Sequence, residues 1–358
     1  MRVVVVGASG NVGTSLLEAL AREPRVESVL GIARRRPAKV FPKTEWVAAD
    51  IRSDELEPLF RGAGAVVHLA WAIQPSHDLA ELRRTNVGGS ARVFRAVASA
   101  GVPVLVHASS VGVYSPGPKD RRVDESWPRD GVPTSFYARH KAETERLLDR
   151  FEKEHPRVRV ARMRPGLIFK RGAASGIRRL FIGPLVPNPL LRRAFLPLVP
   201  DVPGLRFQAV HSLDVGEAYR LATVEEVHGP FNIAAEPVLD SRALGRILGA
   251  RPVPVPAGVL RGAAGVTWRL RLQPTPAGWV DLGLNVPLLD VSRARDELGW
   301  VPRRSAEEAV LELVAGLRES AGIETPPLSP RSGGPARARE VTTGVGGRDD
   351  ANAQKTRR

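Results

Sequence analysis

The chain has 358 residues, of which 43% are hydrophobic and 25% charged, as is usual for a soluble globular protein with more than one structural unit. It contains no cysteine, so disulfides and thiolate metal sites are excluded. No apolar run of about 18 residues is present, and the chain opens on a strand pattern rather than a leader peptide. We therefore expect a cytoplasmic protein without a transmembrane segment.

The formal net charge of +15 is spread in a way that argues against a nucleic-acid binder. Residues 331–358 hold seven Lys or Arg and three Asp or Glu, which leaves +11 for the rest of the chain. Residues 155–200 carry ten basic and no acidic residues, but this run does not have the interleaved aromatic and basic pattern of a strand-binding groove. A solvated arginine-rich surface explains this run, and a phosphate-bearing ligand or an anionic membrane is the alternative.

Strand and helix patterns alternate through the first half of the chain, which predicts an α/β fold with a doubly wound parallel sheet. Helices are expected over about 78–100 and from Tyr137 to about 153. The expected strands are Val3–Val6, Ser28–Ala33, Trp46–Ala49, Ala65–Leu69, Val104–Ala108 and Val158–Met163.

A glycine-rich turn, G-x-x-G-x-x-G, joins the first strand to a helical pattern. This order of strand, turn and helix is the context of a dinucleotide-binding turn, in which glycines let the backbone approach a pyrophosphate at the helix N-terminus. The glycines alone are also compatible with an ordinary tight turn. The expected cofactor-binding residues of this segment are Gly7, Ser9, Gly10, Asn11, Val12 and Gly13.

Tyr137 and Lys141 stand four residues apart on one face of an expected helix, and Ser109 and Ser110 end the fifth strand about 27 residues upstream. Together with the glycine turn, this order of residues resembles the extended short-chain dehydrogenase/reductase family, which includes NAD-dependent epimerases and dehydratases. The resemblance implies a Rossmann sheet, a smaller C-terminal substrate-binding lobe and an NAD(P)-dependent oxidoreductase.

The resemblance also implies roles for the catalytic residues. Tyr137 would exchange a proton with a substrate hydroxyl or carbonyl while hydride moves to or from the nicotinamide. The Lys141 ammonium would lower the pKa of that phenol, which is near 10 when free. Ser110 would hold the substrate oxygen, with Ser109 beside it, and Asn86 would support the site from its helix.

The end of the second strand indicates which cofactor is used. Enzymes that prefer NAD place an acidic residue about 20 positions beyond the glycine turn, but here Ala33 stands there and Arg34 follows. Because a guanidinium can bind a 2′-phosphate, NADP is favoured over NAD, the alternative being arginines that merely decorate a loop. The remaining cofactor positions implied by the resemblance are Asp50, Ile51, Leu69, Ala70, Asn86, Tyr137, Lys141 and Pro165.

The resemblance further suggests a division of the chain. We expect an NAD(P)-binding domain over 1–170 and a substrate-binding lobe over 171–325, with a segment near 207–222 returning to the sheet. Residues 171–206 are rich in Pro and Leu, and 326–358 have a composition typical of a disordered tail.

The segment RMRPGLIFKRG lacks the Asn that sugar-nucleotide epimerases of this family usually carry after the sixth strand. The substrate is therefore expected to be a carbonyl or alcohol compound that is hydrophobic or phosphate-bearing. A nucleotide-sugar epimerase or dehydratase and a non-catalytic NADP-sensing protein remain as alternatives. The seven histidines show no metal spacing, so no metal site is expected.

Relatives pair through the two helices that carry Asn86 and Tyr137, which implies a homodimer. Apolar residues at helical spacing favour this assembly, although all of them can also pack within one subunit. They are Val87, Val93, Phe94, Val97, Leu147 and Leu148.

Overall fold

The computed structural model describes residues 1–73, 77–182 and 198–330. Its larger part is a seven-stranded parallel sheet with the order β12-β7-β5-β4-β1-β2-β3, which confirms the expected fold class. The strand order reverses beside β1, where open α/β sheets form their binding crevice. The strands are β1 (Arg2–Val6), β2 (Ser28–Ala33), β3 (Thr44–Ala48), β4 (Ala65–His68), β5 (Val104–Ala108), β7 (Arg159–Pro165) and β12 (Gly229–Ile233).

Helices cover both faces of this sheet because its strands are apolar on both sides. On β1, Val3 and Val5 belong to one buried cluster, whereas Val4 and Val6 belong to another. The first cluster includes α1 (Asn11–Ala21) and α7 (Ser212–Val224), and the second includes α2 (Glu57–Phe60), α4 (Gly89–Ser99) and α5 (Phe136–Glu154).

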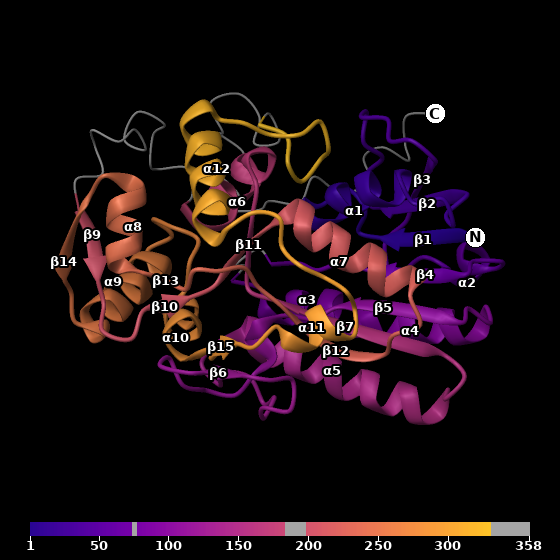
Figure 1. Ribbon diagram of the computed structural model, residues 1–358, viewed down its shortest axis with the longest axis horizontal. Coiled ribbons are helices and arrows are strands. Elements are labelled where there is room, and N and C mark those ends of the chain that lie inside the picture. The colour runs from indigo at the N-terminus through magenta and orange to yellow at the C-terminus, as the bar shows by residue number, and fades with distance from the viewer. Residues whose placement is uncertain (74–76, 183–197, 331–358) are drawn as a thin grey trace.

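A smaller lobe of short elements lies at the left of Figure 1, beyond the carboxyl ends of the strands. Parallel β9 (Leu198–Asp201) and β14 (Arg251–Pro254) pair there, as do antiparallel β10 (Arg206–Phe207) and β13 (Leu239–Asp240). The other elements outside the main sheet are α3 (Leu79–Arg83), α6 (Ala174–Ile177), α8 (Ser241–Leu248), α9 (Ala257–Arg269), α10 (Ala277–Asn285), α11 (Ser292–Asp296), α12 (Ala306–Glu319), β6 (Arg122–Val123), β8 (Leu167–Phe169), β11 (Ala209–His211) and β15 (Leu288–Leu289).

The strand that returns to the sheet is not the one expected near 207–222. There, β11 pairs with β8 outside the main sheet, and only α7 lies on the sheet. The seventh strand is β12, which lies in the range 171–325 that was expected to form the lobe. Its Asn232 side chain is fully buried and accepts a hydrogen bond of 2.6 Å from the Tyr114 hydroxyl. The expected disordered tail lies outside the described residues from 331 onward.

The helix expected over 78–100 is built from three consecutive pieces. A π-helical turn, η1 (Arg84–Gly88), separates α3 from α4 and contains Asn86. The apolar residues Val93, Phe94 and Val97 of α4 pack under the sheet with Leu148 of α5, so they are buried within one subunit. Within the described ranges, no helix combines the length and the apolar character needed to span a bilayer.

Candidate active site

The glycine turn follows β1 at the carboxyl edge of the sheet, and its backbone touches the end of β4. Gly7 has a φ of +88°, and a Cβ there would lie 2.6 Å from the Ala70 nitrogen, so only glycine fits. The Leu69 nitrogen donates a 2.8 Å hydrogen bond to Val6 in the same place. A Cβ on Gly13 would lie 2.5 Å from the Ala8 carbonyl oxygen, so glycine at this position lets α1 approach the turn closely.

The N-terminus of α1 has the features of an anion site. Only the Gly7 oxygen lies within 4 Å of where a Gly10 Cβ would stand, and no described side chain caps the helix. Its first amides and its dipole are therefore available to a diphosphate. The Oδ1 atom of Asn11 is buried without a hydrogen-bond partner, and buried Ser9 and half-buried Val12 complete the turn. These residues fit a dinucleotide.

The ends of β2 and β3 bring Arg34 and Asp50 together. Ala33 is buried and Arg34 is exposed. Burial opposes ionisation of Asp50, but hydrogen bonds from Arg52 and the charge of Arg34 hold the pKa of this carboxyl below its usual value. Arg52 Nε lies 2.9 and 3.0 Å from the two Asp50 oxygens. Ile51 is buried against Gly89 at the start of α4.

Asn86 holds the loop that follows β4. Its Oδ1 accepts a 2.7 Å hydrogen bond from the Ala72 nitrogen, and its Nδ2 donates one of 3.1 Å to the Ala72 oxygen. Asn86 is fully buried, so both bonds are shielded from water. The pair fixes the backbone next to Trp71, whose ring centroid lies 3.6 Å from the Lys141 Nζ atom.

Ser110, Tyr137 and Lys141 meet beyond the carboxyl end of β5. The Ser110 side chain lies beside the Tyr137 phenol, and its hydroxyl accepts a 3.0 Å bond from the Gly112 nitrogen. The Lys141 Nζ atom lies 5.8 Å from the Tyr137 ring centroid and donates a 2.6 Å hydrogen bond to the Ala108 oxygen. The structure thus brings the three expected catalytic residues together, from the end of β5 and the first turns of α5.

The pKa values of Tyr137 and Lys141 differ from those expected from the sequence. Burial raises the pKa of Tyr137 to about 12 although the bond to Ser110 opposes it, and burial lowers the pKa of Lys141 to about 7 although Glu145 opposes it. The expected lowering of the phenol pKa by Lys141 is therefore not found in the protein alone. For both groups, the cost of burying the charged form outweighs the effect of the neighbouring side chains, so both favour their neutral forms.

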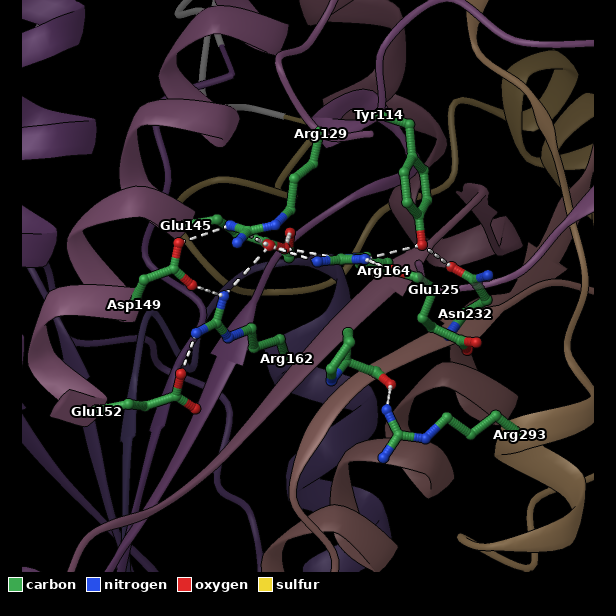
Figure 2. Close-up of polar contacts among 12 residues, drawn as sticks. Tyr114, Glu125, Arg129, Glu145, Asp149, Glu152, Arg162, Arg164, Asn232 and Arg293 are labelled. Atoms are coloured by element: carbon green, nitrogen blue, oxygen red, sulfur yellow. Dashed lines mark hydrogen bonds and ion pairs between the residues drawn. The ribbon is translucent and has the colours of Figure 1, made fainter. Parts of the chain in front are cut away.

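A buried carboxylate connects this site to the sheet (Figure 2). Glu145, one turn beyond Lys141, is fully buried and accepts hydrogen bonds of 2.8 and 2.5 Å from Arg164 of β7. It also accepts a 2.5 Å bond from the Ser109 hydroxyl, and Arg162 lies 3.4 Å away. One side chain on α5 therefore fixes the ends of β5 and β7 beside the reacting groups.

The same network extends to both sides of Glu145. Arg162 bonds Asp149 at 2.7 Å and also pairs with Glu152, both on α5. On the other side, Arg164 Nη1 donates a 3.0 Å bond to the Tyr114 hydroxyl, which in turn donates to Asn232 of β12. Arg293 belongs to the edge of this region, where its Nη1 donates a 2.8 Å bond to the Pro230 oxygen. The three strands at one side of the sheet, β5, β7 and the edge strand β12, are thus tied to α5 by ionic and polar contacts.

Comparison with protein-family models matches residues 3–234 to the NAD-dependent epimerase/dehydratase family. The chain belongs to this family. The resemblance deduced from the motifs is therefore confirmed.

Three similar proteins show how much of each chain the likeness covers. Uncharacterized protein Rv2047c of Mycobacterium tuberculosis is 28% identical over 90% of this chain, which spans only about a third (31%) of that relative. L-arabinose 1-dehydrogenase (NAD(P)(+)) of Haloferax volcanii is 33% identical over 32% of this chain and 42% of its own length. The solved UDP-glucose 4-epimerase of Thermus thermophilus in complex with NAD matches with a TM-score of 0.65 and 23% identity, covering 90% of this chain and all of that one, which shows the shared fold.

The site of this epimerase/dehydratase family member also contains Lys170, which the sequence analysis does not identify. Lys170 is buried and donates to the Asn11 oxygen and to the hydroxyls of Thr14 and Ser15, at 2.7–2.9 Å. This ammonium adds positive charge to the first turn of α1. The signal in the sequence is the pair of basic residues after the sixth strand, which departs from the epimerase pattern and is compatible with a phosphate-bearing ligand.

Gly112 is another such residue, because a Cβ there would lie 2.9 Å from the Tyr137 ring. Pro165 ends β7 and is buried, and the next residue, Gly166, would place a Cβ 2.6 Å from the Gln208 oxygen. No local pattern marks these positions, since both close approaches involve segments distant in sequence. Within the described ranges, no cluster of three or more His, Asp or Glu could hold a metal ion.

The two buried lysines, Lys141 and Lys170, should make the stability of the protein depend on pH. Burial lowers the pKa of Lys141 to about 7 and that of Lys170 to about 8, both from an ordinary value of 10.5. Between the lowered pKa of each lysine and its ordinary value, the unfolded chain binds more protons than the folded one. The free energy of unfolding should therefore rise with pH from about 7 to 10. Urea unfolding of Lys141→Met and Lys170→Met should show a smaller rise. Lys153→Met, at the exposed end of α5, should keep the full rise, and equal slopes in all proteins would contradict the prediction.

Proposed function

We propose that this chain is an NAD(P)-dependent oxidoreductase that acts on a carbonyl or alcohol substrate, with Tyr137 as its acid and base. The observation that carries the proposal is the meeting of Ser110, Tyr137 and Lys141 beside the glycine turn. A bound nicotinamide cofactor would supply or accept the hydride at this edge of the sheet. The turn of residues 7–13, with Lys170 behind it, is the part of the chain suited to hold its diphosphate.

In this proposal the three side chains have different tasks. Ser110 holds the substrate oxygen with its hydroxyl, next to the phenol of Tyr137. In reduction Tyr137 donates its Oη proton to that oxygen, and in oxidation it accepts a proton from the substrate hydroxyl. Lys141, whose ammonium or amine state changes near neutral pH, lies close enough to alter the energy of the phenolate.

The same groups would also serve a nucleotide-sugar epimerase, as in the Thermus protein, so this function is the second candidate. It requires the same hydride and proton transfers and differs in the substrate that the lobe accepts. A cofactor-sensing protein without catalysis would need neither Tyr137 beside Ser110 nor Lys141 beside Tyr137. The catalytic candidates are therefore favoured by the geometry of the three residues.

Replacing the phenol tests the proposed chemistry. In Tyr137→Phe, turnover of the best substrate from a panel of ketones and sugar nucleotides should fall by about a hundredfold or more, the scale of lost acid–base catalysis. NADPH binding, followed by fluorescence, should stay nearly unchanged because the ring remains. Full turnover in this variant would refute the role of Tyr137.

The cofactor preference can be tested at Arg34. NADP is proposed over NAD because Ala33 supplies no carboxylate at the end of β2 and an exposed guanidinium follows. Arg34→Ala should weaken NADPH binding by roughly 1.5–3 kcal/mol, as for a hydrogen bond to a charged group, and change NADH binding little. Arg22→Ala, at the opposite end of α1, is the matched control. Equal weakening of both cofactors, or tighter binding of NADH by the unmodified protein, would contradict this assignment.

We further propose a cytoplasmic homodimer in which α3, α4 and α5 face a second copy. Since their apolar residues pack inside the subunit, the contact would use outer, charged positions such as the ion pair of Arg83 and Glu143. Salt should therefore weaken the dimer. Sedimentation equilibrium at micromolar concentration should give twice 38.7 kDa, and a species of 38.7 kDa at low and high salt would exclude the dimer.

A further inference from the structure

Aromatic rings surround the proposed catalytic phenol. The Trp279 ring of α10 lies 5.0 Å from the Tyr137 ring, centroid to centroid, at an angle of 34°. The Trp71 ring lies 6.1 Å from it, edge to face at 78°. Phe181 meets Trp279 at 5.0 Å. Two indole rings therefore lie next to the proposed catalytic phenol.

Both indoles are held in place by contacts outside the aromatic cluster. The loop of Trp71 is fixed by the two hydrogen bonds between Asn86 and Ala72. At the start of α10, a Cβ on Gly278 would lie 2.5 Å from the Thr134 oxygen, so this helix presses against the chain just before α5. The rings are thus parts of a preformed arrangement around Tyr137.

The indole nitrogens of Trp71 and Trp279 are both buried, and neither has a hydrogen-bond partner in the protein. An unpaired buried donor costs free energy that a bound acceptor recovers. No described carboxylate accepts from either nitrogen, and the cation next to Trp71 is Lys141, which can only donate when charged. The missing partner of both N–H groups is therefore an oxygen acceptor.

We infer that Trp71 and Trp279 form the substrate-binding site around Tyr137, and that this site takes a flat, uncharged, ring-bearing ketone or alcohol with a second oxygen acceptor. Flat rings stack on indoles with an energy beyond simple burial. The second oxygen accepts from an indole N–H while the reacting oxygen meets Ser110 and Tyr137. This inference rests on the proposed function, because it names the substrate class of the same site.

A pair of probe ketones isolates the second oxygen. 6-Methoxy-2-acetylnaphthalene and 6-methyl-2-acetylnaphthalene have the same ring and ketone, but only the first carries the ether acceptor. Their binding is measured by calorimetry with NADPH-loaded protein that carries Tyr137→Phe, so that chemistry does not interfere. The methoxy compound should bind about three- to tenfold more tightly, the range of one neutral hydrogen bond.

Phenylalanine variants then identify the donor. Trp71→Phe or Trp279→Phe, made in the same protein, should remove the advantage of the methoxy compound because the ring stays and the N–H is lost. Trp46→Phe is the control, since that indole nitrogen is also buried and unpaired but lies on β3, against Gly31. A methoxy advantage that survives in both Trp71 and Trp279 variants would overturn the inference, as would UDP-glucose binding more tightly than either ketone.

The two proposals fail in different ways. If the ketones bind as described but protein with an intact Tyr137 does not reduce them with NADPH or NADH, the binding site stands and the oxidoreductase function is wrong. If neither ketone binds while other carbonyl compounds are turned over through Tyr137, the oxidoreductase function stands and the substrate class is wrong.

Discussion

The carboxylate of Glu145 is the contact on which the arrangement of the site depends. It is completely buried, and it stays ionised because Arg164, Arg162 and the Ser109 hydroxyl hold its pKa low against the cost of burial. A buried charge with these partners is costly to disturb, since removal of one partner leaves the others unpaired. Glu145 therefore fixes one orientation of α5 against β5 and β7.

That orientation determines which groups meet. Tyr137 and Lys141 lie two turns and one turn before Glu145 on the same helix, and Ser110 follows the serine that Glu145 binds. The reacting groups therefore inherit their positions from a network that touches neither substrate nor cofactor. Such support by neighbouring side chains is what keeps a catalytic arrangement within the narrow geometry that chemistry requires.

The sequence predicted the fold, and it singled out Ser110, Tyr137 and Lys141, which the structure brings together, because these signals are local. The apolar run before Gly7 marks a strand, and the spacing of Tyr137 and Lys141 places both on one helix face. What could not be predicted depends on contacts between distant segments. The place of β12 in the sheet depends on Asn232 being bonded by Tyr114, and the electrostatics of Tyr137 depend on how completely α10 and the Trp71 loop bury it. Neither contact leaves a periodic pattern in the chain.

The clamp between Asn86 and Ala72 recognises only main-chain atoms. Its two hydrogen bonds go to an amide nitrogen and a carbonyl oxygen, which every residue except proline offers in the same form. The side chain at position 72 is therefore free to change during evolution or protein engineering without loosening the loop. Position 86 has no such freedom, because among side chains of this length only the carboxamide of asparagine presents one donor and one acceptor together.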